Sequence, residues 1–310
     1  MQKRTVTDSK IVKRKKLKRI FHFDYTLVFC LFLIIGFGLI MIYSSSSYTA
    51  NLEYGDPSYF FNRQLIFVLI GLVLMVAGFM INYKWLMQRH WIILVASIVM
   101  LFMLIPMGHS VNGATRWIRL GFFNFQPAEF VKLAVIISIV AMIMTAGRGI
   151  NNLKGRLFII GAIGIIPAGL VYVISSNLSS SIIIFLIVFF MMFIVSPKPK
   201  NYLIALGIAA VIGIIMVLII SNMPADSSSF RFNRIAVWLH PEEYELSTGY
   251  QTVQSLYAIG SGGFLGKGLG KGLQKLGYIP ESQNDMIFAV ICEEVGIFGA
   301  IILLSIFALL

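Results

Sequence analysis

Eight apolar segments run through the sequence, and each is close to the length that a helix needs to cross a bilayer. They lie at approximately residues 25–43, 65–81, 91–107, 129–145, 157–175, 181–195, 202–221 and 286–310. Their apolar residues are continuous and do not alternate with polar ones, so none of the segments calls for a β-barrel. Hydrophobic residues make up 58% of the 310 residues and charged residues only 12%, which is too little polar surface for a soluble domain of this length. The sequence therefore predicts an all-α polytopic membrane protein with eight transmembrane helices.

Positive charge is concentrated at the start of the chain. The formal net charge is +12, and nine of the 25 Lys and Arg residues lie between Lys3 and Arg19. A basic block beside an apolar segment is typical of a protein that meets the anionic cytoplasmic leaflet, and the other basic residues are scattered through loops, which disfavours nucleic-acid binding. We therefore expect residues 1–24 to form a basic cytoplasmic tail and residues 25–310 to form a single multi-helix membrane domain.

The orientation follows from the loops between the apolar segments. With a cytoplasmic N-terminus, the inside loops are 82–90, 146–156 and 196–201, which hold seven basic residues and no acidic one. This asymmetry satisfies the positive-inside rule. The first apolar segment has 19 residues, longer than the roughly 7–15 of a signal peptide, so we expect it to stay in place. The prediction is a multi-pass protein of the bacterial cytoplasmic membrane, with a large extracellular segment at 222–285 that is long enough to hold a site or dock a partner.

Cysteine and histidine give no sign of a metal site or a disulfide framework. Cys30 and Cys292 each lie inside an apolar stretch, where packing is their ordinary role, and the four histidines have no ligand-like spacing. The identity of any bound metal stays open.

The first of three polar clusters lies between the third and fourth apolar segments. Arg116 and Trp117 precede Gln126-Pro127, a pair that suits the start of a helix, and Glu129 and Lys132 then lie three residues apart on one helical face. One interpretation is a structural ion pair, with Arg116 and its neighbour Arg119 reaching toward headgroups. The other is a cationic patch that binds a phosphorylated lipid at its headgroup.

The second cluster lies in the long outer segment. It contains Arg231 and Arg234, then Gln251 and Gln254, and we expect these four residues to bind substrate, as we do Trp117 and Glu129 of the first cluster. The cluster continues into a glycine-rich stretch at 258–272. The stretch does not fit a phosphate-binding loop, because Ser261 stands where the first glycine is needed and Gly268 follows Lys267 where Ser or Thr is needed. We interpret it as flexible backbone near the bilayer surface, and no nucleotide is expected.

The third cluster begins where the chain re-enters the membrane. Asp285 lies at this entrance, and Glu293 and Glu294 lie two turns deeper. A partly desolvated carboxylate suits a general base, whereas an aspartate that caps a helix N-terminus would be stabilised in its charged form, and the sequence leaves both roles open. Glu293 and Glu294 are expected to pair with intramembrane partners.

Three segments, Asn112–Ala134, Gly249–Gly272 and Pro280–Gly299, together resemble the SEDS family (shape, elongation, division and sporulation) of the FtsW/RodA type. The resemblance extends over essentially the whole chain, and the amino-acid sequence from Gly268 to Pro280 is more similar to FtsW than to RodA. It implies a ten-helix fold, of which the last two helices lie beyond Leu310. Septal, elongation and sporulation roles all stay open.

The resemblance also implies an activity. It points to an inverting peptidoglycan glycosyltransferase that polymerises lipid II into glycan strands on the outer membrane face during division or cell-wall growth. The implied partners are lipid II, an undecaprenyl-linked glycan strand, a class B penicillin-binding protein and other divisome or elongasome membrane proteins. Asp285 falls on the family's essential aspartate, and Arg116 and Lys132 fall on its conserved arginine and lysine, with Glu129 between them. These cations, with or without Mg²⁺ or Mn²⁺, would compensate the charge of the departing diphosphate.

Two departures from the family pattern and one alternative function remain. The stretch Ser175–Ser180 stands where the family often has Gln-Pro-Asp-Leu-Gly-Thr, so Asn177 replaces an acid there. Met286 replaces a Phe, a change between apolar side chains of similar volume. The alternative is a lipid II flippase, but no clear internal repeat of the kind that transporters show is found. A scaffold that only recruits a synthase is a third option.

Overall fold

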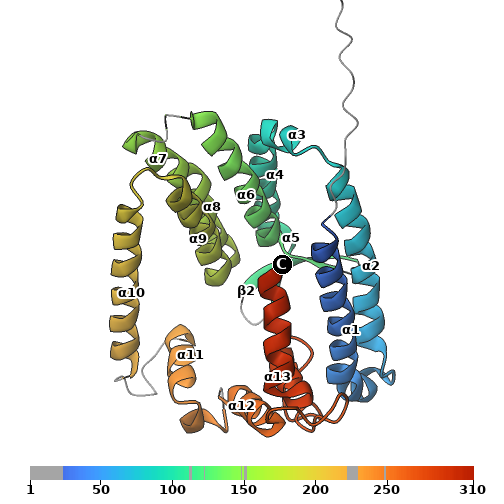
Figure 1. Ribbon diagram of the computed structural model, residues 1–310. Coiled ribbons are helices and arrows are strands. Elements are labelled where there is room, and N and C mark those ends of the chain that lie inside the picture. Colours follow the sequence, from blue (N-terminus) through green and yellow to red (C-terminus); the bar gives the residue numbers. More distant parts are fainter. Residues whose placement is uncertain are drawn as a thin grey trace, which may run out of the picture. The chain divides into compact units, whose positions relative to one another are not determined.

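The computed structural model of the protein describes residues 24–111, 114–121, 123–147, 149, 152–221, 230–247 and 249–310. Within these residues, eight helical spans are long and apolar enough to cross a membrane (Figure 1), which confirms the predicted number and order. The spans are Tyr25–Tyr54, Tyr59–Met80, His90–Met107, Pro127–Ala146, Leu153–Ser175, Leu178–Val195, Lys200–Ile220 and Ile287–Leu309. Residues 1–23 of the predicted basic tail lie outside the described part of the chain.

The chain divides into two compact units, 1–69 with 240–310 and 70–239. The first unit contains α1 (Tyr25–Tyr54), the start of α2 (Tyr59–Met80), η3 (Pro241–Tyr244), α12 (Tyr250–Gly262) and α13 (Ile287–Leu309). The second contains the rest of α2, then α3 (Tyr83–Gln88), α4 (His90–Phe102), α5 (Leu104–Met107), β1 (Gly108–Val111), β2 (Ala114–Leu120), β3 (Phe123–Phe125), α6 (Pro127–Ala146), α7 (Leu153–Ile159), η2 (Ile160–Ile165), α8 (Ile166–Ser175), α9 (Leu178–Val195), α10 (Lys200–Ser221) and α11 (Phe230–Leu239).

Helix α1 is longer than its apolar segment. The apolar segment was expected at 25–43, but the helix continues through the polar run Ser44–Ser47 to Tyr54 and ends at Gly55, whose φ of 70° is left-handed. The hydroxyls of Ser45 and Ser46 donate to the carbonyl of Ile42 at 3.3 and 2.7 Å. Because serine can satisfy its hydroxyl within its own helix, this run does not end the helix.

A small antiparallel sheet follows α5 and was not anticipated. The strand order is β1-β2-β3, and Ile118 at the centre pairs with Gly108 on one side and Phe125 on the other. The strands have four, seven and three residues, too short for their alternation to stand out in the sequence. The sheet leads into α6, which begins at Pro127 with Gln126 before it, as predicted.

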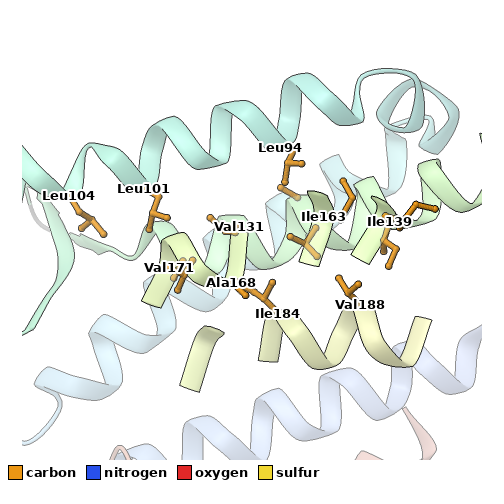
Figure 2. Packing of buried hydrophobic residues seen from close by; sticks show 14 of the residues in the cluster. Leu94, Leu101, Leu104, Val131, Ile139, Ile163, Ala168, Val171, Ile184 and Val188 are labelled. Atoms are coloured by element: carbon orange, nitrogen blue, oxygen red, sulfur yellow. The ribbon is translucent and has the colours of Figure 1, made fainter. Parts of the chain in front are cut away.

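The core of the second unit lies where α4, α6, α8 and α9 pack together. Figure 2 shows its aliphatic side chains meeting from these helices, and Val131, Ile139, Ile163, Ile184 and Val188 are fully buried. The outer faces of the spans are also apolar, and α2 has no buried residue at all. A helix in a bilayer is apolar on the face that packs in the core and also on the face that meets lipid, as these spans are.

The first unit is packed around a kink in α13. Gly296, in the middle of this helix, has φ 70° and ψ −177°, a conformation that favours glycine. Helix α12 lies against the segment before the kink so closely that a Cβ on Gly262 would meet the carbonyl oxygen of Cys292 at 2.1 Å. Small residues at such crossings let helix backbones approach in a membrane.

The crossing of α12 and α13 gives a first prediction. Gly262→Ala places a methyl group against backbone, so we expect it to cost about 1–3 kcal/mol, as overpacking does. Gly260→Ala is the matched control on the same helix, because a Cβ there meets nothing within 4 Å. Thermal stability in detergent, followed by size-exclusion chromatography of heated samples, should fall for Gly262→Ala and stay equal or rise for Gly260→Ala. Equal stability of both variants would contradict the close crossing.

Candidate active site

Asp285 lies in a turn that three sets of contacts hold in place. The side chain of Gln251 on α12 donates to the carbonyl of Pro280 at 3.1 Å. The buried hydroxyl of Ser282 donates to the carbonyl of Ser45 in α1 at 2.9 Å. Within the turn, the backbone N–H of Asn284 donates to the carbonyl of Glu281 at 2.9 Å. The Asp285 side chain itself is exposed, so a fixed turn presents a free carboxylate.

This geometry bears on the two roles that the sequence left open for Asp285. Helix α13 begins at Ile287 with Met286 as its N-cap, and no side chain caps it. Asp285 is therefore not a helix cap. Asp285 is exposed, so the described part of the chain does not desolvate its carboxylate. The partial desolvation considered from the sequence is therefore not found in these residues.

A pocket of about 250 Å³ adjoins this turn. Gln283 and Asn284, the two residues before Asp285, line it from one side, and Arg63 and Gln64 of α2 line it from the other. Ile42, Phe60 and Phe67 complete the wall. Arg63 was missed in the sequence, because the second apolar segment was taken to begin at residue 65 and the arginine was left in the preceding loop.

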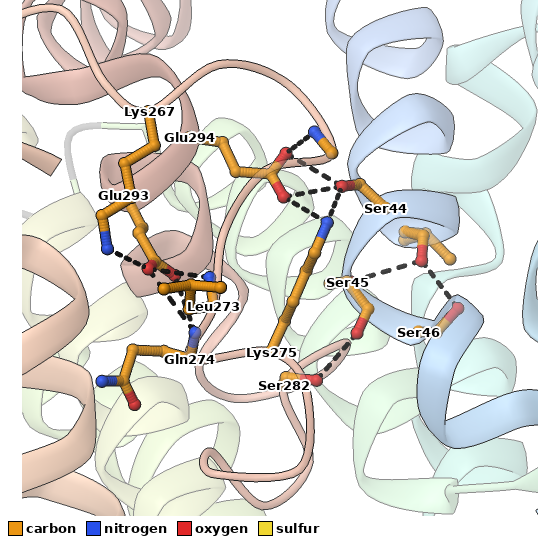
Figure 3. A network of polar contacts seen from close by, with 12 residues as sticks. Ser44, Ser45, Ser46, Lys267, Leu273, Gln274, Lys275, Ser282, Glu293 and Glu294 are labelled. Atoms are coloured by element: carbon orange, nitrogen blue, oxygen red, sulfur yellow. Dashed lines mark hydrogen bonds and ion pairs between the residues drawn. The ribbon is translucent and has the colours of Figure 1, made fainter. Parts of the chain in front are cut away.

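Two buried ion pairs fix the loop that leads to the turn. Figure 3 shows Glu293 and Glu294 of α13 pointing into this loop. The Glu293 side chain is fully buried, and its Oε1 lies 2.7 Å from Nζ of Lys267. The backbone N–H groups of Leu273 and Gln274 also donate to the Glu293 carboxylate, at 3.0 and 3.2 Å.

The second pair adds a serine from α1. Nζ of Lys275 lies 2.6 Å from Oε1 of Glu294, and both side chains are buried. The hydroxyl of Ser44 lies 2.7 Å from the same carboxylate oxygen and 2.8 Å from Nζ of Lys275. The N–H of Gly270 donates to the other oxygen at 2.9 Å. Both glutamates have ionic partners, but Lys267 and Lys275 lie in the loop before α13 and not, as had been predicted, in a membrane span. Each carboxylate also accepts from several other donors, as a buried charge requires.

The glycine-rich segment is closely packed, so its interpretation as flexible backbone was wrong. The N–H groups of Lys267 and Gly268 donate to the carbonyls of Glu293 and Glu294, both at 2.9 Å. Gly266 has a φ of 77°, and a Cβ there would lie 2.2 Å from the carbonyl oxygen of Glu294. Glycine is needed because the loop backbone touches the helix backbone.

Arg116, from the first polar cluster, lies on β2 in the second unit. Its Nη2 donates to the carbonyl of Ser176 at 3.2 Å, and its buried Nε has no hydrogen-bond partner among the described residues. Ser176 lies in the turn between α8 and α9, where Asn177 caps α9 by accepting from the N–H of Ser180. The position where the family often has an acid is thus a helix cap here.

The other residues of this cluster behave as their spacing predicted. Nζ of Lys132 lies 2.8 Å from Oε1 of Glu129, so the expected pair forms on α6. The side chain of Trp117, next to Arg116 on β2, is 38% exposed.

The second polar cluster is divided between the units. Arg231 and Arg234 lie on α11 in the unit 70–239, and Arg234 is exposed. Gln251 and the half-buried Gln254 lie on α12 in the other unit. Gln251 contacts the Asp285 turn through its hydrogen bond to the carbonyl of Pro280.

We also searched the described residues for a cluster of side chains that could bind a metal ion. They contain no group of three or more His, Cys, Asp or Glu side chains that could hold a metal ion. A preformed metal cage of protein ligands is therefore absent from the described ranges.

The Lys275–Glu294 pair gives a second prediction. Lys275→Met leaves a buried carboxylate without its cation, so we expect a loss of about 3–5 kcal/mol in stability. Lys271→Met is the control, since Lys271 lies exposed in the same loop and takes part in none of the ion pairs between described residues. The double variant Lys275→Met with Glu294→Gln should recover most of the loss, because both charges are removed together. Thermal stability in detergent measures all three, and a single variant as stable as Lys271→Met would refute the pairing.

Comparison with known proteins places the chain in a family. Residues 25–310 match the family described as "Cell cycle protein", which covers FtsW, RodA and SpoVE. A protein of Trichlorobacter lovleyi named "Probable peptidoglycan glycosyltransferase FtsW" is 33% identical over 307 residues, which is 96% of this chain and 76% of the relative. The stage V sporulation protein E of Bacillus subtilis is 32% identical over 294 residues, 93% of this chain and 76% of that protein.

Solved structures share the fold. A chain from a peptidoglycan synthase complex that coordinates polymerization and crosslinking aligns with a TM-score of 0.69 and 21% identity, covering 93% of this chain and 76% of that one. The rod shape determining protein RodA of Thermus thermophilus aligns with a TM-score of 0.56 and 21% identity, covering 94% and 74% of the two chains. By its sequence over residues 25–310, and with a fold that agrees, this chain belongs to the FtsW/RodA/SpoVE family.

Proposed function

We propose that this protein is a peptidoglycan glycosyltransferase that polymerises lipid II into glycan strands. Its support is the family membership, with relatives named as peptidoglycan glycosyltransferases at 33% and 35% identity. The observation that supports Asp285 as the catalytic residue is its exposed carboxylate, which lies in a fixed turn beside a pocket that Arg63 lines.

The proposed chemistry is a single displacement at an anomeric carbon. The 4-hydroxyl of the GlcNAc in incoming lipid II attacks the anomeric carbon of the growing strand, and Asp285 accepts the hydroxyl proton. The new glycosidic bond forms as the bond to undecaprenyl diphosphate breaks, and the diphosphate leaves with the bonding electrons. The configuration at the anomeric carbon inverts, and no covalent enzyme intermediate is formed.

Cations are proposed to stabilise the departing diphosphate. Arg63 belongs to the same unit as Asp285. For Arg116 and Lys132, which belong to the other unit, the proposal rests on their match to the family's conserved arginine and lysine. Arg116 has an unpaired buried Nε that can donate to a phosphate oxygen, and Lys132 would exchange its half-exposed partner Glu129 for the diphosphate. Trp117, Arg231, Arg234 and Gln254 are proposed as further substrate contacts, and Gln251 as a positioning residue for the turn.

A metal ion would enter this scheme only with the substrate. Since the described residues hold no three-ligand cluster, Mg²⁺ or Mn²⁺ would be held mainly by the oxygens of the diphosphate and would supply further positive charge there. None of the steps above depends on it.

The membrane orientation and the partner are also proposals. The basic loops 82–90, 146–156 and 196–201 favour a cytoplasmic N-terminus, which puts Asp285 at the outer face where lipid-linked precursors are polymerised. Similarity to a chain of a synthase complex that polymerises and crosslinks favours a class B penicillin-binding protein as the partner.

Asp285→Asn tests the base assignment. It should lower polymerisation of lipid II by purified protein in detergent about 100-fold or more, because a general base contributes about 10²–10⁴ in rate. Glu281→Gln is the control: this exposed acid lies in the same turn, and the amide keeps an oxygen that can accept from Asn284. Detergent-solubilised protein has no second compartment, so polymer formation by the unmodified protein also separates an enzyme from a flippase or a scaffold. Near-normal polymer from Asp285→Asn would show that another group takes the proton.

Arg116→Ala tests the cationic patch. Loss of one charged donor at a developing negative charge should lower kcat/KM by about 100-fold. Arg119→Ala is the control, three residues along the same strand and exposed. Both variants should keep their thermal stability. If Arg116→Ala unfolds instead, the bond to Ser176 is its main role and the structural interpretation holds.

A further inference from the structure

The second unit contains a pocket that the proposed reaction does not use. It has a volume of about 250 Å³ and lies between α7, η2, α9 and the first turns of α10. Its wall is mainly aliphatic and aromatic, with one buried cation, and includes Leu157, Ile160, Phe185, Phe189, Tyr202 and Arg156.

No described residue supplies a counter-charge to the cation in this wall. Arg156 is only 9% exposed, and its Nη1 donates to the hydroxyl of Ser196 at 3.2 Å. Its Nε is buried with no partner, and none of the ion pairs between described residues includes it. A guanidinium has five N–H donors, and burying it without an anion is unfavourable. The bond to Ser196, the residue that follows α9, leaves most of this capacity unused.

The surroundings select an anion. Residues 146–156 and 196–201, which flank the pocket in the sequence, contain five basic residues and no acidic one. Lys154, Lys198 and Lys200 are exposed there. The local field therefore favours a negatively charged ligand near Arg156.

The apolar wall indicates that this ligand carries a chain. Leu157 and Phe185 are 58% and 42% exposed within two membrane spans, so the pocket opens toward the lipid side of these helices. Free phosphate would leave this wall without a contact. An acyl chain would fill it and bring a headgroup phosphate to the basic end of the spans.

We propose that an anionic phospholipid binds in this pocket, with its phosphate on Arg156 and an acyl chain along Leu157, Phe185 and Phe189. The ligand also explains how α10 is held. No residue from Lys200 to Ile219 is buried, and Tyr202 meets α9 through ring contacts with Phe189 and Phe193 at 5.5 and 6.4 Å between centroids. A lipid seated against Tyr202 would add the missing packing at the start of α10.

The test measures lipid binding and does not require glycosyltransferase activity. Purified full-length chain is titrated in detergent with phosphatidylglycerol, and separately with phosphatidylcholine of the same chains, and retained lipid is counted by native mass spectrometry. We expect one tightly held phosphatidylglycerol and weaker retention of phosphatidylcholine. Arg156→Gln should weaken phosphatidylglycerol binding about tenfold or more, because it removes a hydrogen bond to a charged group.

Two further variants separate this site from general surface charge. Lys154→Gln removes an exposed charge beside the pocket and should change binding by less than about threefold. Ala205→Trp fills the pocket from α10 and leaves Arg156 intact, so it should block the acyl chain and reduce binding even if Arg156→Gln proves unstable. Equal retention of both lipids, unchanged binding by Ala205→Trp, or competition by glycerol phosphate as strong as by phosphatidylglycerol would each overturn the proposal.

Discussion

The two adjacent carboxylates of Glu293 and Glu294 inside a membrane span impose the strongest constraint on the first unit. A charge at this depth is costly unless it is paired and fully hydrogen-bonded. Two lysines and several backbone amides of the loop 263–275 satisfy that requirement, and they can do so only if the loop backbone lies directly on α13. The glycines follow from this contact, and the same loop leads into the turn that carries Asp285.

Much of the fold could be predicted from the sequence, because a bilayer leaves few alternatives to an apolar helix of about 20 residues. The eight spans and the start of α6 at Pro127 are of this kind. The extension of α1 through Ser44–Ser47 was harder to predict, because Ser45 and Ser46 bond to the carbonyl of Ile42 within the helix and Ser44 bonds to Glu294, 250 residues away in the chain. The three strands were not predicted because segments of three to seven residues are too short to show the alternation of apolar and polar residues that marks a strand.

At the candidate site, the sequence predicted which residues matter better than it predicted which residues they contact. Glu129 and Lys132 were paired correctly because helical spacing fixes their distance. The partners of the two buried glutamates, Lys267 and Lys275, lie in a loop whose path no periodic pattern describes. Arg63 was overlooked since polar residues in the first turns of a span look like loop, although in the folded chain it lines the pocket next to Asn284.

The left-handed residue in the middle of α13 has a consequence for how this part of the protein is assembled. At Gly296 the helical ladder is interrupted, and the N–H groups of Ile297 and Phe298 donate instead to the carbonyls of Gly263 and Phe264 at 3.1 Å. In hydrocarbon these two amides would find no water to replace that contact. The last span therefore cannot reach its final shape as an independent rod during insertion. It must acquire its bend together with the preceding loop, which makes the two a single unit of biogenesis.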